Sequence, residues 1–263
     1  MRKIVLEERP VNTRGFDDVK LFTLKEIESH FSETLLQVLG HMRLAEMLKD
    51  QGLVEESENI LRSQIVLIEG AYDYYLHELL RLGIVKLFAG EWKAEKKKYY
   101  ELQIPMKFLE IALEDEGSSN WLKEWITEKY SHVTLMDYPQ LKEVCEILGI
   151  SMKDVAELAF YRVASQDKPE HELEKEIRET YSRRNQIAHQ SDRKMGTAER
   201  ESISCEYVEG RIKCVRKIVL ALSEVARRKS GHDERSKKVG SWMRKLQRKL
   251  IDVLRLRIVK LVT

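Results

Sequence analysis

The stretch from Val54 to about Ala89 constrains the fold of this chain more than any other. Its apolar residues recur at intervals of three and four, the spacing that places them on one face of an α-helix. That face contains Leu61, Ile65, Ile68, Tyr72, Tyr75, Leu79 and Leu82. Most of the stability of such a helix comes from packing its apolar face against other elements. The pattern therefore predicts a helical bundle that includes this helix.

Composition and cap signals agree with a mainly helical chain. Only 4 of the 263 residues are Pro and 12 are Gly, and Leu, Glu, Lys and Arg are abundant. Thr23 and Glu26 form a capping box that begins an earlier helix, which should stop near Gly52. Gly70 and Gly83 weaken the long helix locally and allow close helix contacts. We therefore predict an all-α fold.

Between about residues 91 and 166 the helical pattern breaks into shorter pieces. Pro139 begins one of these pieces, and Ser151 caps the start of another. Three aromatic residues in this region could stack on RNA bases, although aromatics spaced four apart are usually part of a core. We expect the core position for all three, which are Trp121, Trp125 and Tyr130.

The C-terminal segment differs from the body in charge. Residues 231–263 contain ten Lys or Arg and three Asp or Glu, whereas the first 230 residues contain 36 and 41. We expect a linker and then a basic amphipathic helix, although the alternation at residues 255–258 fits a strand nearly as well. Three uses stay open: docking on the body or on a dimer mate, which we expect, binding RNA, or lying on an anionic membrane surface.

Several classes of site lack their sequence signals. The three cysteines, Cys145, Cys205 and Cys214, are odd in number and form no Cys-x-x-Cys pair, so we expect neither a disulfide framework nor a zinc site. Nucleotide-binding glycine loops and a His-Glu-x-x-His helix do not occur, so we expect no cofactor and no metal. Without a signal peptide or a membrane-length apolar run, we expect a cytoplasmic chain with no membrane partner.

The residues Arg184 to His189, which read Arg-Asn-x-x-x-His, carry the most specific chemistry. Arginine binds phosphate, histidine transfers protons near neutral pH, and asparagine both donates and accepts hydrogen bonds. These groups can cleave a phosphodiester without a metal. On a helix Asn185 and His189 share a face, but Arg184 lies about 140° from His189 around the axis. Arg184 therefore reaches the histidine through its long side chain, or a second subunit completes the site.

At these residues the chain resembles the HEPN superfamily, and most closely its RiboL-PSP-type members, whose ribonucleases carry an Arg and a His a few residues apart. Residues 62–76 resemble the helix in which those families place an acidic residue beside an aromatic one, and Asp73 stands there in this chain. Residues 205–228 resemble their last bundle helix. Arg183 also satisfies the family spacing, and we prefer Arg184 because Asn185 follows it directly.

The resemblance implies an up-and-down helical bundle over residues 23–230 with an insertion at about 91–166, an N-terminal arm at 1–22 and an appended C-terminal basic helix. It also implies a metal-independent endoribonuclease that cleaves RNA by attack of the 2′-hydroxyl. His189 would be the general base or acid, Arg184 would stabilise the transition state, Asn185 would fix either group, and Asp73 would orient Arg184. Further basic residues would guide the RNA backbone, namely Arg183, Arg193, Lys194 and Arg200.

By the same resemblance we expect a homodimer with a composite active site. A toxin–antitoxin or antiviral defence setting, with an antitoxin or defence protein as partner, also follows from it. The alternative function is a non-catalytic HEPN module that binds RNA, a nucleotide or a protein. A third is a membrane-surface or assembly protein that uses residues 241–263. The motif could also be purely structural, with Arg184 paired to an acid and His189 capping helix carbonyls.

Overall fold

The structure, a computed structural model, describes residues 19–93, 97–114, 119–161 and 168–229. These residues form nine α-helices, and the described part of the chain has one isolated β-bridge and no strand. The predicted all-α class is therefore confirmed. The predicted C-terminal segment, 231–263, lies outside the described residues, as does the predicted N-terminal arm apart from residues 19–22.

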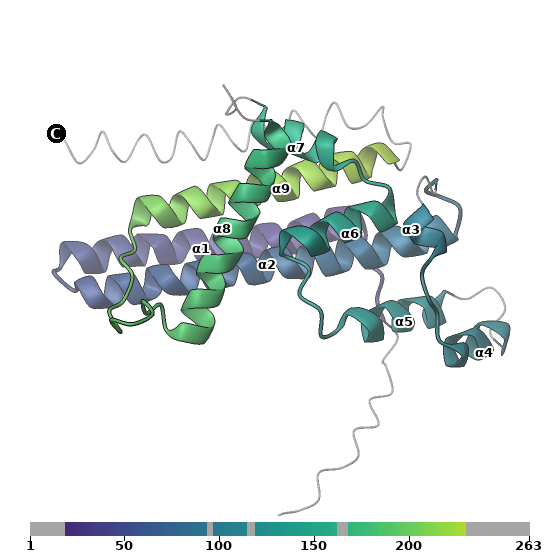
Figure 1. Cartoon of the computed structure of the whole chain (residues 1–263), viewed down its shortest axis with the longest axis horizontal. Helices are drawn as coiled ribbons and strands as arrows, with labels where there is room; N and C mark the ends of the chain where they lie inside the picture. Colours follow the sequence, from purple (N-terminus) through teal and green to yellow (C-terminus); the bar gives the residue numbers. More distant parts are fainter. Residues whose placement is uncertain (1–18, 94–96, 115–118, 162–167, 230–263) are drawn as a thin grey trace, which may run out of the picture.

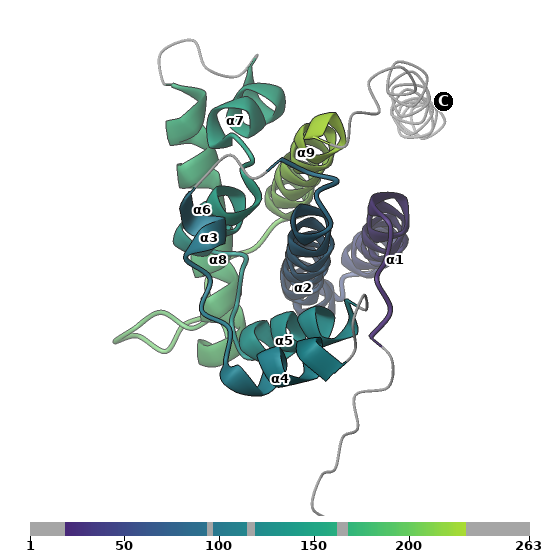
Figure 2. The same ribbon diagram turned by 90° about the vertical axis from the view of Figure 1, so that its right-hand side faces the viewer.

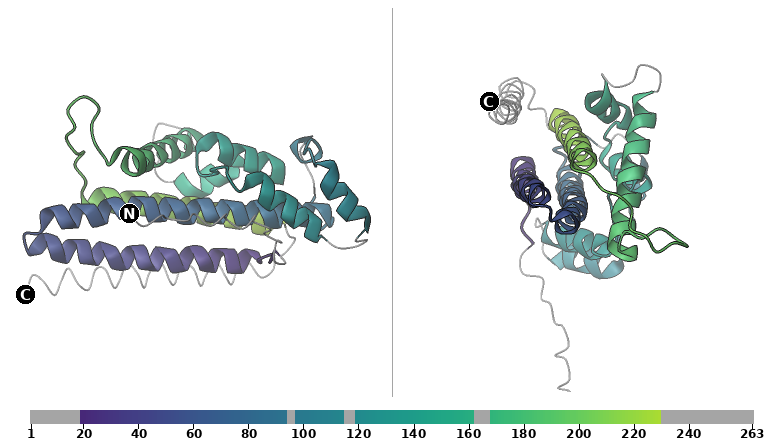
Figure 3. Two further views of the ribbon diagram at one scale, coloured as in Figure 1. Left: turned by 90° about the horizontal axis from the view of Figure 1, so that it is seen from below. Right: turned by 90° about the vertical axis from the view of Figure 1, so that its left-hand side faces the viewer.

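Three long helices run alongside one another. Helix α1 (Leu24–Asp50) and helix α2 (Val54–Phe88) pack along their lengths, and α9 (Cys205–Lys229) lies against both (Figures 1 and 3). All seven residues of the predicted apolar face of α2 are buried. The hydroxyl groups of Tyr75 and Ser223 form a 2.7 Å hydrogen bond that joins α2 to α9 within this core.

The predicted start of α1 is confirmed by its hydrogen bonds. The backbone N–H of Glu26 donates to Oγ1 of Thr23 at 3.3 Å, and the backbone N–H of Thr23 donates to the Glu26 carboxylate at 2.8 Å. The Thr23 backbone N–H, the Thr23 hydroxyl and the Lys20 ammonium all donate to the Glu26 carboxylate and hold its pKa down at about 2. The helix ends at Asp50, and Gly52 follows with a φ of +81° in the turn to α2.

Five shorter helices occupy the predicted insertion: α3 (Lys97–Tyr100), α4 (Met106–Glu114), α5 (Asn120–Tyr130), α6 (Tyr138–Leu148) and α7 (Met152–Phe160). Helices α6 and α7 lie on the side of α2 away from α1 (Figure 2). Pro139 stands in the first turn of α6, and the hydroxyl of Ser151 caps α7, both as predicted. The core position expected for the aromatic residues is also confirmed, since all three are buried: Trp121, Trp125 and Tyr130.

Helix α8 (Pro169–Gln190) crosses the three long helices steeply (Figures 1 and 2). It therefore departs from a simple up-and-down arrangement. The sequence of α8 is compatible with this placement, because the helix is strongly charged and buries only Leu173, Ile177 and Thr180 fully. Such a narrow stripe suits one short crossing contact rather than packing along a whole helix. None of the described helices combines the length and the apolar character that a membrane-spanning helix needs.

Candidate functional site

The Arg-Asn-x-x-x-His motif lies at the C-terminal end of α8. The helix ends at Gln190, and Ser191 follows with a left-handed φ of +52°. The N–H groups of Ser191 and Asp192 both donate to the carbonyl oxygen of Gln186. Backbone groups therefore close the helix, which satisfies part of the carbonyl set left open at a helix end.

The guanidinium of Arg184 is held by its neighbour in sequence. Its Nη1 donates to Oδ1 of Asn185 at 2.9 Å, and the side chain is half-buried. Its Nε is buried and has no hydrogen-bond partner within the described part of the chain. The amide of Asn185 therefore restrains Arg184, and the guanidinium keeps a donor for which the described residues offer no acceptor.

A buried acid on α2, Glu69, faces this arginine. Its side chain is 2% exposed, and its charge interacts with the cations Arg184 and Arg211. Burial raises the pKa of Glu69 to about 8, against the opposing effect of the two cations, and the nearby charge of Asp73 adds to the rise. Glu69 is the acidic residue that the structure brings to the motif arginine. Its signal in the sequence is a charged residue directly beside Ile68 in the apolar stripe.

Asp73, which we expected to orient Arg184, has other partners. Its Oδ1 accepts hydrogen bonds from the backbone N–H groups of Leu135 at 2.7 Å and Met136 at 3.1 Å. Its Oδ2 lies 3.7 Å from Nε2 of His77. Asp73 therefore fixes the segment between α5 and α6, and the expectation for its role is corrected: Glu69, one turn earlier, is the acid beside Arg184.

His189 is exposed in the last turn of α8, and no described residue forms a hydrogen bond or ion pair with it. The structural explanation of the motif, in which His189 caps helix carbonyls, is therefore wrong for this residue. The imidazole is available to a ligand from solvent. Asn185 shares its face of α8 by spacing, whereas Arg184 interacts electrostatically with the buried Glu69 on α2.

Arg183 has a structural role and is not available to guide RNA. Its two terminal nitrogens each lie 2.9 Å from one carboxylate oxygen of Asp192, which is fully buried. Nε of Arg62, on α2, donates to the same carboxylate at 2.7 Å. This Arg62–Asp192–Arg183 cluster ties α8 and the loop after it to α2. The expected RNA-binding role of Arg183 is therefore corrected.

The other three basic residues named from the sequence lie on the loop between α8 and α9. Arg193 and Arg200 pair across an isolated β-bridge, so the loop folds back on itself. Arg200 donates to Oδ1 of Asn59 at 2.9 Å, and Nζ of Lys194 lies 3.7 Å from Glu201. All three basic side chains are exposed at the surface, on the loop that follows His189 directly.

Comparisons with protein-family models, with curated proteins and with solved structures find no match for this chain. Among the described residues, no group of three or more His, Cys, Asp or Glu side chains is arranged to hold a metal ion. All three cysteines are buried, and none of them forms a disulfide.

Proposed function

We propose that this chain is an endoribonuclease that cleaves RNA through Arg184 and His189 without a metal. The observation that carries the proposal is an exposed imidazole without a partner in the described chain, on the same helix end as a guanidinium that the amide of Asn185 restrains. A free imidazole can transfer a proton, and a restrained cation can stabilise developing negative charge. The resemblance to HEPN ribonucleases adds to this argument and supplies the toxin–antitoxin or antiviral setting as a proposal.

In the proposed reaction, His189 takes the proton of a ribose 2′-hydroxyl. The 2′-oxygen then attacks the adjacent phosphorus, and the bond from phosphorus to the 5′-oxygen breaks. The leaving 5′-oxygen takes a proton from water, and the imidazolium of His189 returns its proton to the solvent, so the products are a 2′,3′-cyclic phosphate and a 5′-hydroxyl. Arg184 stabilises the negative charge that builds on the phosphate oxygens. DNA lacks the 2′-hydroxyl nucleophile and is therefore not a substrate.

The orientation of the two groups supports a site shared between two copies. Arg184 is half-buried and turned toward α2, whereas His189 points to solvent from another side of the helix. Residues five apart are separated by about 140° around a helix axis. In a homodimer, His189 of one copy and Arg184 of the other would contact the same phosphate. Mixing the two inactive single variants tests this arrangement, because a mixed dimer then contains one intact site.

The test of the nuclease is RNA cleavage by the full chain in the presence of EDTA. We expect Arg184→Ala and His189→Ala each to lower the cleavage rate about 100-fold or more, because each removes a group that acts in the transition state. Matched controls lie on the same helix: His171 and Arg178 are exposed, and their alanine variants should keep the wild-type rate. Equal cleavage by His171→Ala and His189→Ala preparations would identify the activity as a contaminant.

A second candidate function is a non-catalytic module that binds RNA, a nucleotide or a protein. The hydrogen bond from Arg184 to Asn185 favours it, because a guanidinium already bound within the chain has fewer donors for a reacting phosphate. This candidate predicts RNA binding that weakens in Arg184→Ala, with no cleavage by the wild type. Binding and cleavage measured on the same preparations separate the two functions.

A further inference from the structure

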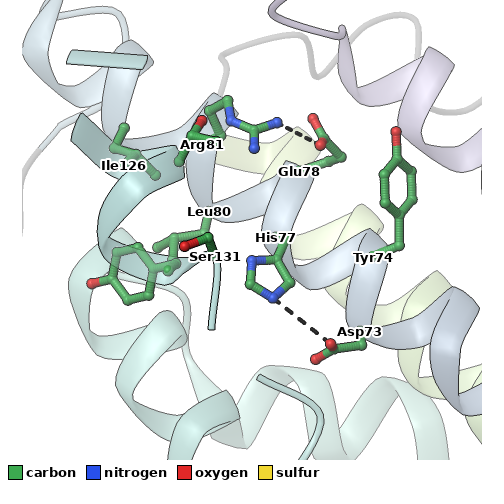
Figure 4. A pocket seen from close by; sticks show the side chains of 10 residues that line it. Asp73, Tyr74, His77, Glu78, Leu80, Arg81, Ile126 and Ser131 are labelled. Carbon is green, nitrogen blue, oxygen red and sulfur yellow. Dashed lines mark hydrogen bonds and ion pairs between the residues drawn. The ribbon is translucent and has the colours of Figure 1, made fainter. Parts of the chain in front are cut away.

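A second polar site lies on α2, separate from the motif. A pocket of about 290 Å³ opens between α2 and α5. Its walls include Asp73, His77, Glu78 and Arg81 from α2 and Ile126 and Tyr130 from α5 (Figure 4). We call it the α2–α5 pocket. Small-ligand sites span about 300–1,000 Å³, so this pocket stands at the lower limit of that range and is too small for a dinucleotide.

His77 lines this pocket, and its hydrogen bond fixes which ring nitrogen carries a proton. Its Nε2 lies 3.0 Å from the carbonyl oxygen of Val133. A carbonyl oxygen only accepts hydrogen bonds, so Nε2 carries a proton and donates it. Oδ2 of Asp73 lies 3.7 Å from the same nitrogen, and a dashed line joins the two residues in Figure 4. In the neutral ring, Nδ1 is then an acceptor, and no described residue forms a hydrogen bond with it.

Glu78 and Arg81 supply an acceptor and a donor side by side. Nη1 of Arg81 donates to Oε1 of Glu78, and both side chains are largely buried (Figure 4). Within the described chain, the buried Nε of Arg81 has no hydrogen-bond partner. The second carboxylate oxygen of Glu78 likewise accepts no hydrogen bond from a described residue. A buried donor without a partner costs free energy; Nε is closed off from solvent, so a ligand acceptor reaches it only when the Arg81 side chain shifts.

We propose that the α2–α5 pocket binds a guanine base. Guanine presents two adjacent donors, N1–H and the N2 amino group, which match a carboxylate, and two acceptors, O6 and N7, which match a guanidinium. Adenine, cytosine and uracil do not offer two adjacent donors on that edge. The side chains of Ile126 and Tyr130 provide apolar surface for the base. The guanine belongs either to a free nucleoside or nucleotide or to an unpaired position in RNA.

The first test uses the unaltered full chain and compares nucleosides by isothermal titration calorimetry. Guanosine should bind, and inosine, which lacks only the N2 amino group, should bind about tenfold more weakly because one donor to the carboxylate is lost. Adenosine and cytidine should bind more weakly than guanosine. Equal affinity for guanosine and inosine, or no guanosine binding, would overturn the proposal. Binding of free glutamine in place of guanosine would overturn it as well, by showing an amino-acid site.

The second test changes the protein. Glu78→Gln should lower guanosine affinity about tenfold, because an amide replaces the acceptor pair. Glu110→Gln, at an exposed position on α4, is the matched control and should leave affinity unchanged. Circular dichroism shows whether each variant keeps its helices. An unchanged guanosine affinity in folded Glu78→Gln contradicts the assignment.

Two further measurements locate the guanine and separate this site from the nuclease. A single-stranded RNA that contains one guanine should displace guanosine if the bound base belongs to RNA. It should not displace guanosine if the ligand is a free nucleoside. His189→Ala should lose cleavage and keep guanosine binding. Glu78→Gln should keep cleavage and bind guanosine more weakly. Failure of the nuclease therefore leaves the guanine site intact, and failure of the guanine site leaves the nuclease intact.

Discussion

A buried carboxyl group sets the electrostatics around Arg184. Glu69 lies in the core of α2, and burial raises the pKa of Glu69 to about 8. At neutral pH this carboxyl is therefore mostly protonated and uncharged. The positive charge of Arg184 is then not cancelled by its nearest buried acid. This arrangement leaves the arginine as a cation that can bind phosphate.

The protonation of Glu69 gives the folded protein a defined pH dependence. The folded pKa of about 8 lies above the ordinary value of 4.5, so the folded state holds a proton that the unfolded state releases. This stabilisation is present below pH 4.5 and is lost as pH rises through about 8. The wild type should therefore lose stability relative to Glu69→Gln over that window, measured by urea unfolding at each pH. The exposed control Glu110→Gln should follow the wild-type curve.

The sequence located the motif but not its partners. Arg184, Asn185 and His189 were recognisable by residue type and spacing alone. Glu69 and Asp73 lie one turn apart on α2. The point at which α8 crosses α2 determines which of the two acids lies near Arg184. Arg183 and Arg184 are neighbours that point about 100° apart, and the buried Asp192 takes the first of them. These choices depend on contacts distant in sequence, which local patterns do not report.

Other helices cover most of the circumference of α2. Its two glycines differ in this respect, because Gly83 faces a packed neighbour and Gly70 faces open space. A Cβ added at Gly83 would lie 2.4 Å from Cδ2 of Leu148 and 2.9 Å from the ring of Trp92. A Cβ at Gly70 would meet nothing within 4 Å. The predicted close helix contact is therefore confirmed at Gly83 and wrong at Gly70.

The two glycines should respond oppositely to alanine. Gly70→Ala should raise the free energy of unfolding by ~1 kcal/mol, because alanine favours the helix and the position is open. Gly83→Ala gains the same helix preference but overpacks the contact with α6, which costs ~1–3 kcal/mol, so it should be neutral or destabilising. Chemical unfolding of both variants measures the difference. Equal stabilisation by both would show that α6 yields easily at Leu148.

Periodicity and caps predicted the elements better than their arrangement. The long helices α1 and α2 and the cap at Ser151 follow from local signals, because a cap and an apolar stripe act within a few residues. The steep crossing of α8 does not follow from them. It depends on which surface of α2 the shorter helices leave open, and that surface is defined only after they pack.

At the scale of the whole molecule, one buried cluster connects segments far apart in sequence. Asp192 is fully buried between Arg62 of α2 and Arg183 of α8. Arg62 also donates to the backbone carbonyl of Glu201, on the far side of the loop, at 2.8 Å. The loop that follows the motif is therefore fixed to the bundle at both of its ends.

Removal of the Asp192 charge should destabilise the whole fold. Asp192→Asn removes the counter-charge that Arg183 and Arg62 share and leaves Arg62 only its ion pair with Glu58 at 3.1 Å, and breaking a buried pair in this way costs ~3–5 kcal/mol. Urea unfolding followed by circular dichroism measures the loss. The exposed Asp50→Asn serves as the control and should change stability by less than ~0.5 kcal/mol. A similar small change in Asp192→Asn would mean that the two arginines find other partners.

The hydrogen bonds of Arg62 to Asp192 and to Glu201 predict how the protein responds to proteolysis of this loop. The tip between Lys194 and Arg200 is exposed, with Met195 91% accessible, and it lies between the two points that Arg62 grips. When a protease cuts the backbone there, both fragments stay bound to the bundle, because Asp192 before the cut and Glu201 after it remain attached to Arg62 on α2. The two fragments would stay assembled as one particle, which makes this tip a natural place to divide the protein into halves that find each other again.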